Sequence, residues 1–257
     1  MKTLLFTIFL SVLSVSSWSQ NKGAGGGPGF NFRQKAASKE GKRWTLQEWM
    51  EQKNNNYIMD LWLGMYAPSP YEFFISGAQL SYTNKTNLTP ATSPETANSF
   101  RSSQGALGAY ALIIGLQGEY ENNWEEKYNE LNGSLNLRVL GNAIQGTHLI
   151  LQYGQRTRNY QNLSAPLTIS QPFAGAELDL YLMRYFGLHG LYRSFLTTTD
   201  STLGDVNGSR SEAGAFIDFE AVRIFGHWYS DKQDQTRSGT ITHIDRTGVV
   251  TGIKFFF

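Results

Sequence analysis

The feature that most constrains this chain is an alternation of apolar and polar residues that repeats from residue 71 to the C-terminus. In residues 129–139, one face is Leu131, Gly133, Leu135, Leu137 and Val139, and the other is Glu130, Asn132, Ser134, Asn136 and Arg138. Successive side chains of a β-strand point to opposite faces, so one face of this segment suits lipid and the other suits water. The same split recurs in residues 174–183 and 212–220. Segments of this length predict tilted strands that cross a bilayer.

The first residues have the composition of a secretory signal peptide. Lys2 precedes a mostly apolar run from Leu4 to Leu13, and small residues up to Ser19 offer a cleavage site, which predicts a signal over 1–19. The chain has no cysteine, so it is neither a disulfide scaffold nor an acylated lipoprotein. After the signal, no apolar run is long enough for a membrane helix. The exported chain therefore either stays soluble or enters the membrane as a closed sheet.

The residues between the signal and the alternating region form a leader of different composition. Residues 20–44 are rich in glycine and then basic, which predicts a flexible segment. Residues 45–66 are predicted to form an amphipathic helix, with Thr45 as its N-cap and Glu48 as the capping-box partner. The aromatic and aliphatic residues available for packing include Trp44, Trp49, Leu61 and Trp62. This helix could plug the barrel, pack in the periplasm, lie on the inner leaflet surface or contact a neighbouring subunit, and we favour the first two.

The connections between the alternating segments are of two kinds. Four places put a bulky pair before glycine, which predicts tight hairpin turns at 111–115, 137–141, 183–187 and 222–226. Longer polar stretches predict loops near 85–101, 121–127, 160–170, 199–209 and 232–242. Alternating short turns and long loops give about ten antiparallel strands over 71–257, with the first and last strands paired. Residues 102–122 could instead be one strand, which would leave nine and prevent closure.

The C-terminal residues carry the most specific motif. Glycine stands sixth from the end at Gly252, and aromatic residues stand third from the end and last at Phe255 and Phe257. This ending resembles the C-terminal assembly signal of bacterial outer-membrane β-barrel proteins, although Val250 replaces the usual polar residue. The resemblance implies an all-β, closed transmembrane barrel in the outer membrane, with both termini periplasmic and with the barrel-assembly machinery as a partner during biogenesis. A soluble sandwich is the alternative, but terminal phenylalanines would make a poor exposed edge.

The polar face of the strands predicts what fills the barrel. The inferred inward charges include Glu130, Arg138, Arg156, Glu177, Asp179, Arg193, Asp218, Glu220 and Lys254. Both signs are present, and the lumen of a barrel of about ten strands is largely filled by side chains. We therefore expect an ion-paired, hydrogen-bonded core and a closed or very narrow lumen. A narrow porin-like solute channel is the alternative.

Catalytic, metal and nucleic-acid sites find little support in the sequence. His243 and Asp245 share one face of the last strand, as an acid–base pair would, but a spacing of two residues is common by chance. A barrel-type lipid-modifying enzyme or protease is therefore the third hypothesis. No cysteine pair or cluster of ligands predicts a metal, and no cofactor motif is present. The formal net charge of +1 implies no nucleic-acid partner.

A second resemblance concerns the leader and its junction with the barrel. The stretches Arg43–Trp49 and Pro68–Phe73 resemble the leader of small outer-membrane proteins from Bdellovibrio-type predatory bacteria, and some relatives of those proteins are similar to ring-forming, lipid-enclosing oligomers. This implies a structural or lipid-organising role, outer-membrane lipid as partner, and a homo-oligomer. Small lipid-facing residues would allow close approach between subunits, and the candidates are Ala174, Ala176, Ala213 and Ala215. An ordinary lipid-facing wall is the other interpretation.

Overall fold

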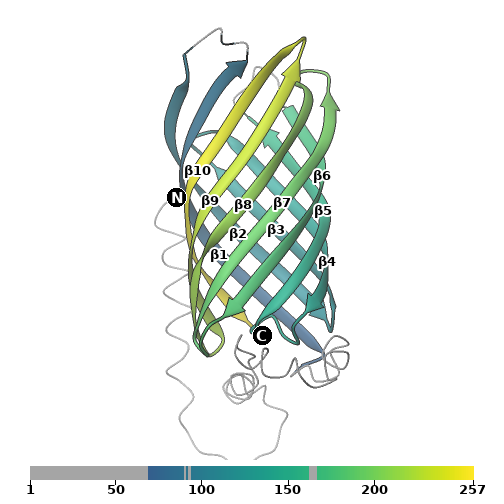
Figure 1. The fold of residues 1–257 in the computed structure, drawn as a ribbon, viewed down its shortest axis with the longest axis vertical. Coiled ribbons are helices and arrows are strands. Elements are labelled where there is room, and N and C mark those ends of the chain that lie inside the picture. Colours follow the sequence, from purple (N-terminus) through teal and green to yellow (C-terminus); the bar gives the residue numbers. More distant parts are fainter. Residues whose placement is uncertain (1–68, 90, 92–93, 162–166) are drawn as a thin grey trace, which may run out of the picture. The chain divides into compact units, whose positions relative to one another are not determined.

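A computed structural model of the protein describes residues 69–89, 91, 94–161 and 167–257. In these residues ten antiparallel strands form a closed barrel (Figure 1). The strands are β1 Tyr71–Thr89, β2 Thr96–Ala111, β3 Ile114–Asn123, β4 Tyr128–Leu140, β5 His148–Tyr160, β6 Leu167–Tyr181, β7 Phe186–Asp200, β8 Gly204–Phe219, β9 Val222–Arg237 and β10 Thr240–Phe256. The predicted signal peptide (1–19), flexible leader (20–44) and amphipathic helix (45–66) lie outside the described residues.

No helix in the described part of the chain has the length and apolar character needed to span a membrane.

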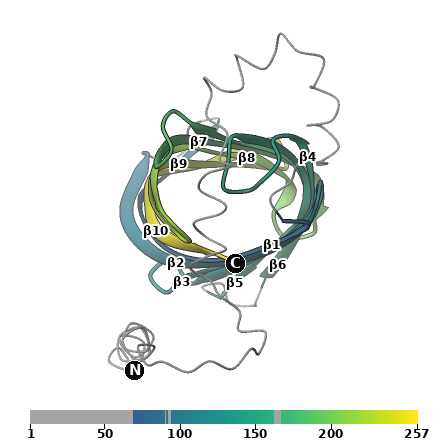
Figure 2. The ribbon, with the colours of Figure 1, turned by 90° about the horizontal axis from the view of Figure 1, so that it is seen from below.

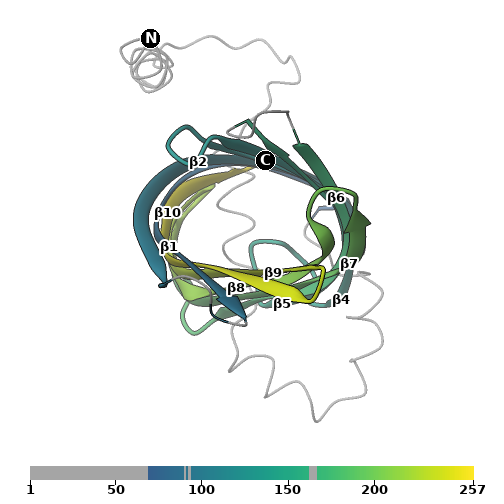
Figure 3. The same cartoon turned by 90° about the horizontal axis from the view of Figure 1, so that it is seen from above.

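Each strand pairs with its sequence neighbours, and β1 pairs with β10 to close the wall (Figures 2 and 3). The closing register places Phe74 opposite Phe256 and continues to Thr89 opposite Ile241. Residues 102–122 are split by a hairpin at Leu112, whose φ of 54° makes the turn. The predicted count of ten and the pairing of the first and last strands are therefore confirmed.

The barrel has two different ends. At the turn end lie the connections β2–β3, β4–β5, β6–β7 and β8–β9, the start of β1 and the end of β10; the other five connections lie at the loop end (Figure 1). The predicted long loops at 199–209 and 232–242 are wrong, because Ser201–Leu203 alone joins β7 to β8 and Ser238–Gly239 alone joins β9 to β10. Ser238 and Gly239 have φ of 50° and 81°, as a two-residue type I′ turn requires. These segments are largely polar on both faces, as loops are, but their backbones remain paired as strands.

The outer face of the wall carries an apolar belt toward the turn end and polar side chains toward the loop end. Outward apolar residues of the belt include Phe73, Ile75, Leu107, Leu116, Leu131, Leu135, Leu137, Leu151, Leu188, Ile217, Ile224, Trp228 and Val249. Beyond it, the outward positions of β8, β9 and β10 are polar, as at Ser209, Lys232 and Asp245. An apolar outer belt around a polar interior is the arrangement of a barrel embedded in a bilayer.

Glycines make room for aromatic rings inside the wall. An added Cβ at Gly115 would overlap the ring of Tyr110, and one at Gly187 would overlap the ring of Phe216. These glycines belong to the bulky-pair motifs, but they lie in β3 and β7 and not in the turns themselves. The turn predicted at 222–226 is displaced, because β9 already begins at Val222 and Glu220–Ala221 makes the turn.

Candidate functional site in the barrel interior

The polar face of every strand points into the lumen, where charged side chains fill the space. Seven of the nine predicted lumen charges are buried there: Glu130, Arg138, Arg156, Glu177, Asp179, Arg193 and Asp218. Lys254 is half-buried, and its ammonium lies 4.4 Å from the centre of the Phe74 ring. Glu220 is the exception. It is exposed and has φ of 52°, because it occupies the β8–β9 turn where strand alternation ends.

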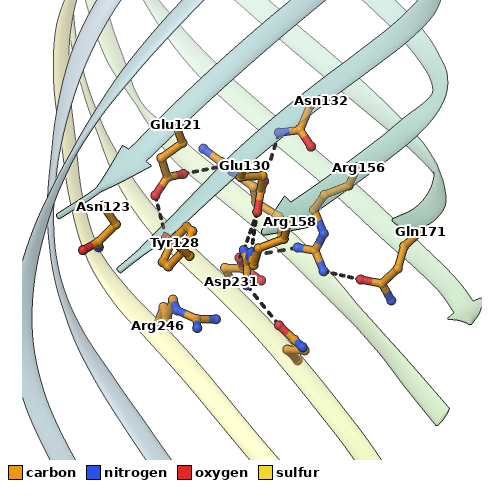
Figure 4. Close-up of polar contacts among 12 residues, drawn as sticks. Glu121, Asn123, Tyr128, Glu130, Asn132, Arg156, Arg158, Gln171, Asp231 and Arg246 are labelled. Atoms are coloured by element: carbon orange, nitrogen blue, oxygen red, sulfur yellow. Dashed lines mark hydrogen bonds and ion pairs between the residues drawn. The ribbon is translucent and has the colours of Figure 1, made fainter. Parts of the chain in front are cut away.

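An arginine-centred network fills the lumen toward the loop end (Figure 4). Arg158 of β5 donates to Glu130 of β4 and to Asp231 of β9, each at 2.6 Å. Beside it, Arg156 donates to Gln171 at 2.7 Å and stacks over the Phe195 ring at 3.4 Å. Strands on different sides of the wall are thus joined through the lumen by charge-assisted hydrogen bonds.

The β3–β4 connection reaches over the loop-side opening. Glu126 of this connection accepts a 2.7 Å hydrogen bond from Arg246 of β10 and a 2.6 Å hydrogen bond from the Tyr82 hydroxyl of β1. Burial alone would raise the pKa of the Glu126 carboxyl, but the guanidinium of Arg246 and these hydrogen bonds hold it below its usual value. An ionised carboxylate therefore binds the connection to β1 and β10, strands with which β3 and β4 do not pair.

A second layer occupies the middle of the barrel. Arg193 of β7 makes two 2.6 Å hydrogen bonds to the carboxylate of Glu119 on β3, and its Nε donates to Gln152 at 2.9 Å. The amide of Gln152 in turn donates to Glu177 at 2.9 Å. Two parallel N–H···O bonds are the strongest geometry available to an arginine–carboxylate pair.

A third layer lies near the turn end. Arg223 of β9 pairs with Asp218 at 2.7 Å and with Asp179 of β6. Asp179 also lies 2.7 Å from Nδ1 of His189. On the other side of the opening, Arg138 of β4 pairs with Glu72 of β1 at 2.5 Å.

The β4–β5 connection, residues 141–147, folds into the turn-side opening (Figure 2). Ile144 is buried against Phe74, Tyr110, Ile150 and Phe256, and its backbone N–H donates to Glu72 at 3.0 Å. The amide of Gln145 donates to the backbone carbonyl of Glu220 at 2.8 Å. The motif at 137–141 predicts only a tight turn, whereas the connection has the seven residues 141–147 and folds inward. The sequence signal for this is the apolar pair Ala143–Ile144, which is unusual in a connection between strands.

A cavity of about 80 Å³ lies in mid-barrel, lined among others by Glu119, Glu177, His189, Glu212 and Lys254. It has room for a few water molecules.

Two groups of side chains in the lumen could each hold a metal ion: His189, Glu212 and His227, and His148, Glu177 and Asp179. The ligand atoms within each group lie within 4.8 Å of one another. The sequence gives no hint of either group, because the members come from different strands and only strand register brings them to one level.

His243 and Asp245, the predicted acid–base pair, lie on the outward face of β10 near the loop end. His243 Nδ1 lies 2.7 Å from Asp234 of the neighbouring strand. Both side chains line an open groove of about 820 Å³ on the outer surface. The histidine is therefore oriented by a carboxylate that the two-residue spacing did not identify.

The predicted contact residues on the outer wall form two separate pairs. Ala174 and Ala176 lie on β6, Ala213 and Ala215 lie on β8, and β7 runs between them. In the register of the sheet, Ala176 is opposite Tyr192 and Ala213 is opposite Gly190. The small-residue surface therefore continues from β8 to Gly190 but is interrupted by Tyr192.

The C-terminal motif residues close the wall. Phe257 exchanges two backbone hydrogen bonds with Phe73, of 2.9 and 3.3 Å. Phe255 points outward beside Ile75, whereas a side chain at Gly252 would overlap Ala78 and the ring of Phe225. The glycine of the ending thus leaves space for an interior aromatic residue.

Comparisons with known proteins give similarity at the level of solved structures. No protein-family model and no curated protein matches the sequence. The translocator domain of the autotransporter NalP from Neisseria meningitidis is similar at 11% identity and a TM-score of 0.33, covering 86% of this chain and 99% of that one. Ail, the attachment invasion locus protein of Yersinia pestis, gives 9% identity and a TM-score of 0.27, covering 74% and 100%. OprG from Pseudomonas aeruginosa gives 14% identity and a TM-score of 0.26, covering 72% and 95%.

These TM-scores are too low to assign the fold, so the fold is assigned from the geometry of the chain itself. An even number of antiparallel strands closes without a free edge, the outer face carries an apolar belt, and the lumen is polar. The chain has the fold of a bacterial outer-membrane β-barrel protein.

Proposed function

We propose that this protein is a non-conducting barrel of the bacterial outer membrane with a structural or lipid-organising role, whose turn end faces the periplasm. The observation that carries the proposal is the filled interior. Ion-paired layers follow one another through the lumen, and the inward turn at 141–147 occupies the turn-side opening. A barrel whose inside is occupied in this way acts through its outer surface.

The outer surface offers shallow apolar hollows at the level of the belt. One of about 490 Å³ is lined by residues that include Leu107, Leu116 and Leu135, and one of about 330 Å³ by residues that include Ile75 and Tyr120. Gly118 lines both, and a side chain there would project into open space. Hollows of this size and character fit lipid acyl chains, which supports a lipid-organising role.

Planar-bilayer recordings of the full chain test the sealed lumen. We expect a membrane that contains the protein to show no discrete conductance steps. Regular, long-lived openings would contradict the proposal and favour the porin-like alternative.

The lipid arm of the proposal is tested with spin-labelled lipids. Gly118→Leu should fill both hollows and reduce the motionally restricted lipid seen by electron paramagnetic resonance. The matched control is Gly226→Leu, an outward glycine of β9 where an added Cβ would meet only Thr251 Cγ2, at 4.0 Å. Equal lipid restriction in both variants and the natural protein would contradict a role for the hollows.

Self-association belongs to the same proposal. The mass of the protein in nanodiscs should exceed that of one chain, and Ala213→Leu should reduce it because it fills the small-residue surface shared with Gly190. Ala111→Leu, on the outer face of β2 and outside both hollows, is the control. A monomeric mass for the natural protein and for both variants would contradict self-association.

A further inference from the structure

We propose that the lumen binds one divalent transition-metal ion of the zinc class through His189, Glu212 and His227. This site is independent of the lipid-organising role. Imidazole nitrogen together with a carboxylate oxygen is a donor set that suits zinc, and three protein ligands leave one coordination position open.

Strand register brings the three side chains together around a glycine. His189 of β7 and His227 of β9 are both register partners of Gly214 on β8, the strand between them. A side chain at Gly214 would overlap His227. Because glycine stands there, the two imidazoles meet above it, with ring centres 4.1 Å apart. Glu212, two residues earlier on β8, faces the same space.

His189 has the outer-sphere partner that metal-binding histidines usually have. Its Nδ1 lies 2.7 Å from Asp179, and Asp179 is itself held by Arg223. An N–H donated to a carboxylate fixes the tautomer and leaves Nε2 as the free donor atom for a metal. The ring is therefore oriented as a ligand before any ion arrives.

Glu212 also has one oxygen occupied and one available. Arg210 binds its Oε1 at 2.7 and 2.8 Å. The second oxygen, Oε2, lies 3.5 Å from Nδ1 of His227. A carboxylate that is anchored on one oxygen can ligate with the other.

His227 is the observation that points most directly to a ligand. The residue is only 7% exposed, yet neither ring nitrogen has a hydrogen-bond partner among the described residues, and Nδ1 approaches Glu212 Oε2 only to 3.5 Å. A buried polar group without a partner is costly, and a metal ion would satisfy it. A metal ion bound to an imidazole lies near the plane of the ring. The His189 and His227 rings are stacked at an interplanar angle of 11°, so one ion cannot lie in both ring planes in this arrangement. A turn of the His227 ring, which no hydrogen bond opposes, would allow it.

Distances and charge are compatible with a small cation. The three donor atoms lie within 4.8 Å of one another, and tetrahedral zinc with bonds of about 2.1 Å needs its ligands roughly 3.4 Å apart, so binding would draw the side chains together. The mid-barrel cavity of about 80 Å³ touches His189 and Glu212 and offers space for a water as fourth ligand. Glu119, Glu177 and Glu212 line this cavity together with Arg193 and Lys254, and of the three carboxyl groups only that of Glu177 makes no ion pair with any described residue, so a bound cation would give it a partner.

The neighbouring group of His148, Glu177 and Asp179 is the weaker candidate. His148 Nδ1 contacts the carbonyl of Gly146, which leaves Nε2 available. However, the two oxygens of Asp179 are already engaged by Arg223 and His189. A cation there would have to displace an arginine.

The experiment uses the full chain in detergent micelles or nanodiscs, with Zn²⁺ added either to the folded barrel or during refolding from urea. Bound zinc is measured by elemental analysis after gel filtration. We expect about one equivalent in at least one of the two procedures, and at least a tenfold loss of affinity in His227→Asn and in Glu212→Gln. Asp179→Asn, which removes the outer-sphere partner, should lose about 10–100-fold.

His243→Asn is the matched control, because this histidine is also paired with a carboxylate but is 40% exposed on the outer face. It should bind zinc like the natural protein. Failure of the natural protein to bind zinc in both loading procedures would overturn the proposal. Zinc binding by His227→Asn equal to that of the natural protein would overturn it too, and so would loss of binding in His243→Asn. If the interior variants fail to fold, Co²⁺ added to the natural protein decides. Intense visible absorption typical of tetrahedral cobalt supports the site, and the weak spectrum of octahedral cobalt overturns it.

Discussion

The side-chain amide of Gln145 donates a 2.8 Å hydrogen bond to the backbone carbonyl of Glu220, and so joins the β4–β5 connection to the β8–β9 turn. The two turns are 75 residues apart in the chain. Between them, Ile144 is buried on an aromatic cluster that belongs to the inner wall. The inward turn is therefore held by both polar and apolar contacts.

Weakening these contacts should open the turn end. We expect the double variant Ile144→Ser, Gln145→Ala to show brief conductance steps in planar bilayers, because the buried apolar anchor and the cross-turn hydrogen bond are both lost. Met183→Ser, in the exposed β6–β7 turn, should stay silent like the natural protein. Silent recordings from the double variant would mean that the layers behind the turn seal the lumen without it.

Two glycines of β3 make opposite predictions. Gly115→Ala should destabilise the barrel by about 1–3 kcal/mol, because the new methyl group overlaps the Tyr110 ring inside the wall. Gly118→Ala should be neutral or stabilising by about 0.5–1 kcal/mol, because its methyl group meets nothing within 4 Å and alanine restricts the unfolded chain. Urea unfolding in micelles, followed by tryptophan fluorescence, measures both. Equal effects would contradict the packing of the Tyr110 ring over Gly115.

The central ion pair should be far more sensitive than a surface pair. Glu119→Gln leaves the buried guanidinium of Arg193 without its bidentate partner, and we expect a loss of about 3–5 kcal/mol in the free energy of unfolding. Glu95→Gln removes the exposed partner of Lys85, 3.5 Å away, and should cost roughly 0–1 kcal/mol. The same urea titration serves both variants. A small effect at Glu119 would indicate that water reaches the pair.

Glu126 should contribute to an acid-dependent stability. Its folded pKa lies below its unfolded value of about 4.3, because Arg246 and its hydrogen bonds outweigh burial. The ionised carboxylate therefore stabilises the barrel above about pH 4.3, and this contribution is lost as the pH falls through the lower folded pKa. Glu126→Gln should be less stable than the natural protein at pH 7, with the difference shrinking below about pH 4. At pH 7, Glu125→Gln, a change at its exposed neighbour, should cost less free energy of unfolding than Glu126→Gln.

The alternation of apolar and polar residues predicts the barrel wall. In β4 it is sufficient to identify which residues face outward and which face the lumen. It does not predict where a strand ends: the polar outer positions of β8 to β10 have the composition of loops, and alternation places Glu220 in the lumen although it lies in a turn. Alternation also does not predict the inward turn at 141–147 or the group of His189, Glu212 and His227. Both depend on contacts between strands, such as His189 and His227 meeting over Gly214, and single-strand periodicity carries no information about cross-strand neighbours.

The most direct test of the account is the accessibility of single cysteines placed along β4, which is possible because the chain has no natural cysteine. Nitroxides at Leu131 and Leu135 should collide with oxygen dissolved in lipid more than with a water-soluble nickel complex. The near-isosteric Ser134→Cys should resist a water-soluble thiol reagent until the barrel is unfolded, since Ser134 faces the packed interior. Preference of the outward labels for nickel, or rapid reaction of Ser134→Cys in the folded barrel, would contradict a sealed barrel embedded in lipid.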